Sequence, residues 1–427
     1  MPGSAVAQRD AALHRILQVV GARTLHSFGR TILARTVGWE LYERTHDNRV
    51  IGVVGLVQVL PVILLFVPSG QLVDRSDRRR LAMLCALAAG GIALALAVAS
   101  GTESPLPVYF AILLAMGCVT SVSSPASSSL IPMIIPREDL QRANRIGSSL
   151  SELASIGGPA LAGLALIVVH PTALYAAVAI TSSVTAILYR GLPAPRPLEG
   201  VTPGAAAAAR KDWRAGLRFI FRNKLLLPAL TLDMFAVLFA GVTALLPAVA
   251  SDVLHVGSFG YGVLCAAEAV GGVLMAVIGS RIAAWKRPGR VLLIVVATFG
   301  AATMGFGFST WFPLSVLLLV VGGALDNISV VIRLTLEQMV VPDRIRGRVS
   351  AVHFVFIGMS NELGAAESGF AAGLVGTVPA IVGGGALAML VVAFVALRWR
   401  ALAAMPPLAE LEPDAEAAVE IAAATPV

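Results

Sequence analysis

Three ionisable residues occur at helical spacing in a long apolar stretch of the sequence. Asp326, Arg333 and Glu337 are seven and four positions apart, and they are the charged residues of the stretch 312–339. Since an α-helix turns by about 100° per residue, their side chains lie within about 40° of one another on one face. Arg333 and Glu337 are spaced to pair, which leaves Asp326 as a free carboxylate that can bind and release a proton. The alternative is a structural ladder of ion pairs.

Further ionisable residues lie in other apolar stretches, where a charge is costly and a functional role is the first hypothesis. Arg23 and Arg30 share a helix face and suit an anionic or catecholate-like solute, although they could equally pair with acids elsewhere. Because these stretches hold more acids than arginines, several carboxylates have no arginine partner, which favours proton binding. The candidate residues for binding a solute or a proton are Arg23, Arg30, Glu152, Asp233, Glu268, Asp326, Arg333 and Glu337.

Two histidines, His26 and His353, also lie in apolar stretches. A histidine there could relay protons, because its charge changes near neutral pH. A single histidine on an apolar helix is more often part of a structural hydrogen bond. We therefore interpret both as structural and keep the proton relay as the alternative.

The composition excludes most soluble functions. Hydrophobic residues make up 57% of the 427 residues, charged residues make up 13%, and the mean hydropathy is +0.83. Soluble chains hold about 45–50% apolar and about 25% charged residues. The sequence has no HExxH, GxSxG or GxxxxGK[ST] motif, and Cys85, Cys118 and Cys265 are isolated in apolar stretches. We therefore expect no enzymatic activity, no bound metal, no cofactor and no direct use of ATP.

The apolar stretches are long enough to cross a bilayer, which takes about 20 mostly apolar residues. Reading them between charged, proline or glycine breaks predicts an all-α membrane protein with twelve transmembrane helices. The first helix is the weakest prediction, because Arg23, Arg30, Arg35 and Glu40 interrupt it. The predicted spans are 17–43, 48–73, 80–100, 106–129, 141–169, 171–190, 225–250, 259–281, 291–309, 312–339, 347–375 and 378–397.

The distribution of basic residues sets the expected orientation of the spans. With the N-terminus inside, nearly all Lys and Arg residues outside the spans fall in cytoplasmic segments, and the external loops hold Arg44 and Arg49. This asymmetry accounts for the net charge of +7 without a nucleic-acid partner. Residues 1–13 lack the apolar core of a signal peptide. We expect a multi-pass protein of the cell membrane, inner or plasma membrane, with both termini in the cytoplasm.

The longest polar stretch divides the predicted spans into two sets of six. Its aromatic and basic residues between 213 and 224 predict a short interfacial helix, with a solvated linker as the alternative. Loop sequences at 70–79 and 136–142 recur at nearly one offset in the second half, which predicts two pseudo-symmetric six-helix bundles. The predicted domains are a bundle over 1–191, a cytoplasmic linker over 192–224, a bundle over 225–400 and an acidic, disordered cytoplasmic tail over 401–427.

The loop after the second predicted span carries a recognisable motif. Its residues, Gly70-x-Leu-x-Asp74-Arg75-x-x-Arg78-Arg79, resemble the loop 2–3 signature of the major facilitator superfamily. Other segments resemble the branch of that superfamily that contains the enterobactin (siderophore) exporter and related efflux proteins. These segments are 37–45, 55–61, 124–132, 136–140, 347–349 and 360–364.

Two motifs carry expectations about moving parts. We expect Asp74 to hold Arg75 or Arg78 in one access state and to release it in the other, while Gly70 lets two helix ends approach. The alternative is that these arginines only set the topology. A second motif, Gly158-Pro159-x-x-x-Gly163, resembles in part the Gly-Pro motif of drug–proton antiporters, and close helix packing is the alternative for it.

The resemblance implies a secondary active transporter. It implies a proton-coupled exporter, an antiporter for efflux of a small organic solute that is siderophore-like or drug-like, working by alternating access. The implied partners are a small-molecule substrate, protons as the coupling ion and the lipid bilayer. Two alternatives stay open at this point, namely an importer of a small solute and a non-transporting membrane sensor or scaffold with the same fold.

Overall fold

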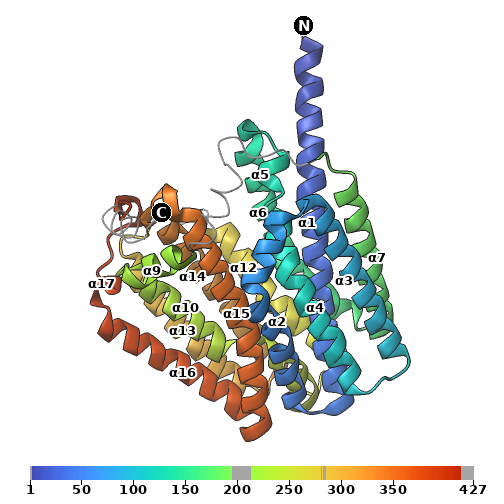
Figure 1. The fold of residues 1–427 in the computed structure, drawn as a ribbon. Coiled ribbons are helices and arrows are strands. Elements are labelled where there is room, and N and C mark those ends of the chain that lie inside the picture. The colour runs from blue at the N-terminus through green and yellow to red at the C-terminus, as the bar shows by residue number, and fades with distance from the viewer. Residues whose placement is uncertain (1, 195–212, 280, 282–284, 415–427) are drawn as a thin grey trace. The chain divides into compact units, whose positions relative to one another are not determined.

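The computed structural model describes residues 2–194, 213–279, 281 and 285–414, and this part of the chain is helical without a β-strand (Figure 1). The helices form two compact units. Unit 1 consists of Met1–Arg44 and Val57–Ala205, and unit 2 consists of Thr45–Leu56 and Ala206–Val427. The boundary between Ala205 and Ala206 falls inside the stretch expected to be a linker. Each unit has its own apolar core.

Unit 1 contains the helices of the first half of the chain, with α3 packed along both α4 and α7. Asp77 fixes the start of α3, because its side chain accepts hydrogen bonds from the backbone N–H groups of Arg79 and Arg80. The helices are α1 (Pro2–Thr45), α2 (Asn48–Arg75), α3 (Arg78–Gly101), α4 (Leu106–Ser128), α5 (Ile131–Ile134), η1 (Arg137–Asp139), α6 (Leu140–Ala165) and α7 (Pro171–Arg190).

Unit 2 contains the helices of the second half and the first turns of α2. Those turns are held on the end of α15, where the Arg49 guanidinium donates twice to the carbonyl of Gly373, at 3.2 and 3.0 Å. The main helices of this unit are α9 (Trp213–Arg222), α10 (Leu226–Ala240), α12 (Gly257–Gly279), α13 (Pro288–Phe308), α14 (Phe312–Val340), α15 (Asp343–Val375) and α16 (Thr377–Arg398).

The helix expected over 225–250 is interrupted. α10 ends at Ala240, because Gly241 adopts an extended conformation (φ −73°, ψ 92°). The chain continues as a 3₁₀ turn (Val242–Leu245), the short α11 (Leu246–Ala248) and a π-helical turn (Val249–Val253). Pro247 lies in this broken part and cannot donate a backbone hydrogen bond to a continuous helix.

The segment expected to be an interfacial helix forms α9, and one face of it is part of the core of unit 2. Ala215, Phe219 and Ile220 are buried in that core, whereas Phe221 is 60% exposed. The side chains of Trp213 and Arg214 lie outside the described residues. α9 is thus packed on α15 and α10 instead of lying free at a surface.

The C-terminal segment differs from the expected disordered tail. Residues 400–414 fold back on unit 2, with α17 (Arg400–Ala403) and η4 (Leu408–Glu410). Leu402 and Met405 are fully buried in the core of unit 2. Asp414 accepts a hydrogen bond from the Asn223 amide at 3.0 Å and donates its own N–H to the carbonyl of Val340. The prediction of disorder is therefore wrong for 401–414, while 415–427 lie outside the described residues.

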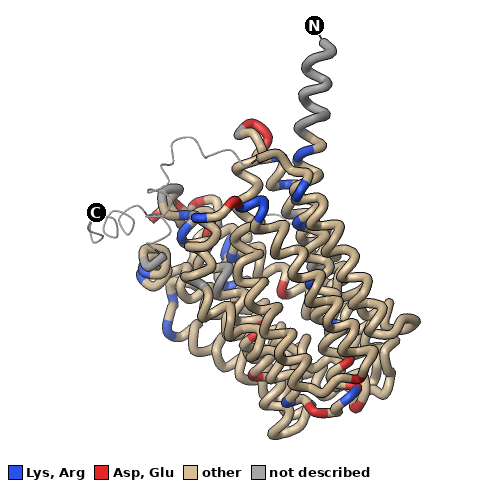
Figure 2. The backbone as a smooth tube through the Cα atoms, turned by 45° about the vertical axis from the view of Figure 1, so that its right-hand side comes forward, with Lys and Arg blue, Asp and Glu red and all other residues tan. Residues whose placement is uncertain are grey.

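Within the described residues, nine helical segments are long and apolar enough to cross a membrane. α1, α6 and α15 are the long helices that do not meet this measure, and each carries several charged residues that the sequence analysis also assigned to spans. Figure 2 shows that most Lys and Arg residues of each unit gather toward one end of its helices, whereas the middles of the helices carry few charges. This arrangement is what a lipid environment requires of a helical protein.

Candidate functional site

A buried ion pair joins α10 and α14 in unit 2. The Arg333 guanidinium contacts the carboxylate of Asp233, and the two residues are only 3% and 8% exposed. Arg333 Nε also donates to the carbonyl of Ser329, one turn earlier in α14, at 3.1 Å. The expected pairing of Arg333 with Glu337 on the same helix is therefore wrong. The packing of α10 against α14 supplies a buried acid from another helix instead.

Glu337 takes part in a second buried cluster, between α14 and α15. Its Oε1 accepts a hydrogen bond from Ser350, and its Oε2 shares a hydrogen bond with His353 Nδ1. Glu337 and His353 are 5% and 4% exposed. His353, which the sequence analysis interpreted as structural, is thus bonded directly to a candidate proton-binding carboxylate.

The local sequence explains why these three side chains meet. α14 ends at Val340 and α15 begins at Asp343, so only Val341 and Pro342 connect the two helices, and Pro342 cannot continue the hydrogen bonds of α14. Glu337 therefore lies one turn before the end of α14. Ser350 and His353 are three positions apart and share one face of α15. A short connection between two helices brings such faces together.

Asp326, the expected proton site, does not lie in a buried position. It is exposed on α14, about two turns from Arg333, and its role as a proton-binding carboxylate stays a prediction. Glu268 of α12 is half-buried, and Thr243 Oγ1 donates to its carboxylate at 3.4 Å. A cavity of about 20 Å³, lined by Glu268, Thr303 and several apolar residues, is large enough for one water molecule.

The described contacts of unit 1 do not bring its candidate solute- and proton-binding residues into one cluster. Arg23 is half-buried and Arg30 is exposed on α1. The side chain of Glu152 lies outside the described residues. His26 of α1 is bonded through Nε2 to Ser123 Oγ of α4 at 3.0 Å, which agrees with a structural role.

Sequence reasoning missed a buried carboxylate in unit 1. Glu40 of α1, which the sequence analysis noted only as a charge that interrupts the first predicted span, is 6% exposed. It accepts hydrogen bonds from the phenols of Tyr109 (α4) and Tyr175 (α7), each at 2.7 Å. Arg44 donates to Tyr109 Oη at 2.8 Å and lies over the Tyr109 ring. This network ties three helices together. The available signal was that each tyrosine lies within the first five residues of a predicted span, 106–129 or 171–190.

We expect Tyr175→Phe to lower the stability of the protein by about 1 kcal/mol, because it removes a donor from the buried Glu40 carboxylate. Thermal unfolding of the purified protein in detergent measures the effect. Tyr189→Phe on the same helix is the matched control, because the Tyr189 hydroxyl is buried without a hydrogen-bond partner among the described residues. Equal melting temperatures for the two variants would contradict the structural role of Glu40.

The side chains of the loop motif at residues 70–79 are only partly described. The side chain of Asp74 lies outside the described residues, Arg75 is exposed, and Arg78 Nη1 lies 3.2 Å from Met133 Sδ. A Cβ placed on Gly70 would have no neighbour within 4 Å. The expectation that Gly70 lets two helix ends approach stays a prediction. The role of Asp74 as a gate stays a prediction.

The Gly-Pro motif of α6 lies in a helix–helix contact. A Cβ on Gly158 would lie 2.9 Å from the Cβ of Thr31 in α1, so glycine permits this approach. Pro159 and Gly163 are buried, and α6 continues through both. The packing interpretation accounts for these residues.

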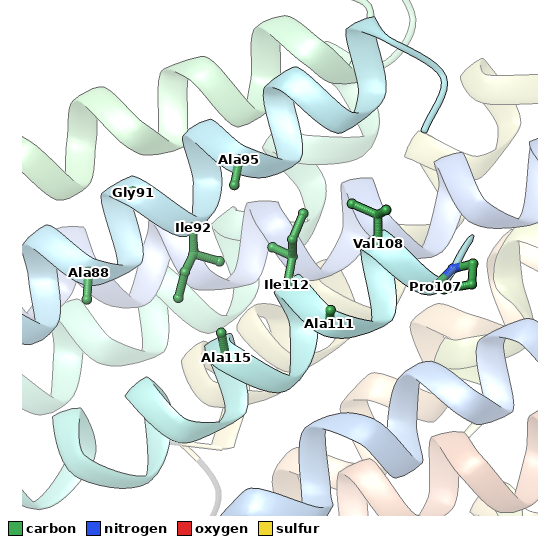
Figure 3. A pocket seen from close by; sticks show the side chains of 9 residues that line it. All are labelled: Ala88, Gly91, Ile92, Ala95, Pro107, Val108, Ala111, Ile112 and Ala115. Carbon is green, nitrogen blue, oxygen red and sulfur yellow. The ribbon is translucent and has the colours of Figure 1, made fainter. Parts of the chain in front are cut away.

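A groove of about 620 Å³ lies on unit 1 between α3 and α4 (Figure 3). Small and aliphatic side chains line it, and no charged group points into it. A groove of this kind offers nothing that would orient an ionic solute. The lining residues are Ala88, Gly91, Ile92, Ala95, Pro107, Val108, Ala111, Ile112 and Ala115.

The helical fold and the buried intramembrane charges are those of a transport protein, and comparison with known proteins identifies the family. The profile of the Major Facilitator Superfamily matches residues 19–365, so the chain belongs to this superfamily of membrane transporters.

Relatives and solved structures agree with this assignment. The chain is 26% identical to the enterobactin exporter EntS of Citrobacter koseri over 339 residues, which cover 78% of this chain and 79% of that protein. The EntS protein of Shigella dysenteriae serotype 1 gives the same values. Among solved structures, a bacterial homolog of the human lysosomal transporter Spinster has a TM-score of 0.68 at 14% identity, covering 90% of this chain and 96% of that one. The D-xylose–proton symporter has a TM-score of 0.67 at 12% identity, covering 89% and 96%. These structures share the fold.

Proposed function

We propose that this chain is a proton-coupled exporter of a small organic solute, siderophore-like or drug-like, that works by alternating access. In this proposal it has twelve transmembrane helices in two six-helix bundles and lies in the inner membrane with both termini in the cytoplasm. The similarity to EntS over most of both chains supports export and a siderophore-like solute.

The observation that carries the proposal is two buried ionisable pairs of unit 2, Asp233–Arg333 and Glu337–His353, whose members on α14 lie one turn apart; together they are called the buried cluster. Asp233, Arg333, Glu337 and His353 are all at most 8% exposed in a membrane transporter. Ionisable groups are expensive at such positions, and they commonly mark ion or solute pathways. A cluster that contains a carboxylate and an imidazole can exchange a proton with water when the access state changes. This supports protons as the coupling ion.

An importer and a non-transporting sensor or scaffold are the competing functions. Export is favoured over import by the similarity to EntS. A sensor or scaffold has no need of a buried, four-residue ionisable cluster, whereas a transporter that couples to an ion does. The cluster therefore favours transport over the scaffold.

Transport into energised inverted membrane vesicles tests the proposal. We expect vesicles that contain the protein to accumulate iron-free enterobactin or the cationic dye ethidium, and a protonophore to reduce this accumulation to that of empty vesicles. Vesicles without the protein are the control. Accumulation that persists with the protonophore would exclude proton coupling, and accumulation only in right-side-out vesicles would favour the importer.

A further inference from the structure

The buried cluster of unit 2 has a charge balance that depends on one proton. Asp233 and Arg333 form a neutral ion pair. Glu337 and His353 form the second pair. With one proton on this second pair, the cluster carries no net charge, whether the proton is on the carboxylate or on the imidazole. Without that proton, the cluster carries one net negative charge.

The net charge of the cluster affects its free energy strongly because the cluster is buried. All four side chains are nearly inaccessible to solvent. A net charge without water or a counter-ion is costly in such surroundings, whereas a neutral, hydrogen-bonded cluster is much less so. The buried arrangement therefore favours the form that holds one proton. A conformational step that admits water to Glu337 and His353 removes this preference and lets the proton leave.

Other ionisable groups occur on the elements around this cluster. Some make contacts elsewhere: Arg346 donates to the carbonyls of Gln338 and Val341, Arg290 donates to the carbonyl of Ala403, and Glu268 accepts from Thr243. Apart from the cluster itself, the described acidic and basic residues on α9, α12, α13, α14, α15, α16 and η4 are Arg218, Arg222, Glu268, Arg290, Asp326, Arg346, Arg348, Glu362, Glu367, Arg398 and Glu410.

We propose that Glu337 and His353 together form the proton-binding site of this transporter and share a single proton between α14 and α15. This inference rests on the proposed proton coupling and names the residues that perform it. It moves the site from Asp326 to the end of α14. It also gives His353 a role as the second proton-binding group, while Ser350 only orients the carboxylate. Arg333 and Asp233 stay a fixed ion pair and hold no transported proton.

A shared proton has a signature that two independent groups do not have. When two sites interact strongly, protons bind to the pair and not to either residue alone. Removing Glu337 then removes the need for the proton, removing His353 leaves the proton on the buried carboxylate, and removing both costs one proton in total. Two independent groups would each contribute a proton, so their losses would add.

Proton binding by the full-length protein in lipid nanodiscs tests this inference without knowledge of the solute. We expect Glu337→Gln to lower the number of protons taken up between about pH 9 and pH 5 by about one per chain, and His353→Gln to leave that number unchanged, because the buried carboxylate then holds the proton itself. The double variant is expected to lose about one as well. Ser350→Ala is the matched control, since it removes a hydrogen bond to Glu337 but no proton-binding group, and it is expected to lose none.

The possible outcomes are distinct. No loss in Glu337→Gln, a loss of one proton in His353→Gln, or a loss of two protons in the double variant would overturn the shared site. Glu337→Asp keeps a carboxylate and is expected to keep the proton that Glu337→Gln loses. Glu337→Met, which has a side chain of similar length without a proton-binding group, serves in place of Glu337→Gln if that variant does not fold. Failure of the proposed function looks different, because wild-type vesicles would then show no accumulation that the protonophore abolishes.

Discussion

Arg333→Ala is expected to destabilise the protein by about 3–5 kcal/mol, because it leaves the Asp233 carboxylate buried without its counter-ion. The loss should be far larger than for an exposed arginine such as Arg30, whose substitution is expected to change stability by less than about 0.5 kcal/mol. Thermal or denaturant unfolding in detergent measures both variants. Arg333→Ala should also abolish transport, because α10 and α14 lose the contact that fixes their relative position.

A double variant separates the structural contribution of this pair from its functional one. Asp233→Leu with Arg333→Met replaces both charges by apolar groups of similar volume, and buried pairs replaced in this way often keep or gain stability. We expect the double variant to recover most of the stability lost in either single variant, which gives a large coupling energy. Recovery of stability without transport would assign the charges a role in transport. A double variant as unstable as the sum of the singles would contradict a direct pairing of Asp233 with Arg333.

For α14, the sequence was a better guide to the residues that form the candidate site than to the partners of those residues. Helical periodicity places Asp326, Arg333 and Glu337 on one face, and it makes Arg333 and Glu337 possible partners. Periodicity carries no information on which helix faces α14. The choice of Asp233 depends on the packing of α10, which is remote in sequence and set by the apolar core of unit 2. For the same reason the periodicity gave no sign that Asp326 is exposed.

Composition was a poor guide for the C-terminal segment. The acidic residues after Arg400 predicted disorder, but Leu402, Met405, Leu408 and Leu411 recur every three positions and pack on the core of unit 2. That three-residue spacing of apolar side chains was the sign in the sequence of a folded segment.

Hydropathy was a better guide for the helices, since every predicted span corresponds to helix in the described residues, even where Gly241 and Pro247 interrupt it. Backbone hydrogen bonds must be satisfied inside the membrane, so an apolar stretch of this length has few alternatives to a helix.

Adjacent glycines of α14 are expected to respond in opposite ways to the same substitution. A Cβ on Gly323 would collide with the backbone carbonyl of Glu268 in α12, whereas a Cβ on Gly322 would lie 3.7 Å from the Phe299 ring, an ordinary contact. We expect Gly323→Ala to destabilise the protein by about 1–3 kcal/mol, because α12 and α14 must move apart. Gly322→Ala should be neutral or stabilising by up to about 1 kcal/mol, because alanine favours a helix more than glycine does.

The same comparison can be made on α16, which gives an independent test. A Cβ on Gly384 would collide with the carbonyl of Phe239 in α10, while a Cβ on Gly383 would have no neighbour within 4 Å. Gly384→Ala should therefore lower the melting temperature of the purified protein, and Gly383→Ala should not. Because each pair consists of neighbouring residues with the same change in composition, helix propensity cancels and the difference reports the approach of two backbones. Equal melting temperatures within both pairs would show that α12 and α10 are not held this close to α14 and α16.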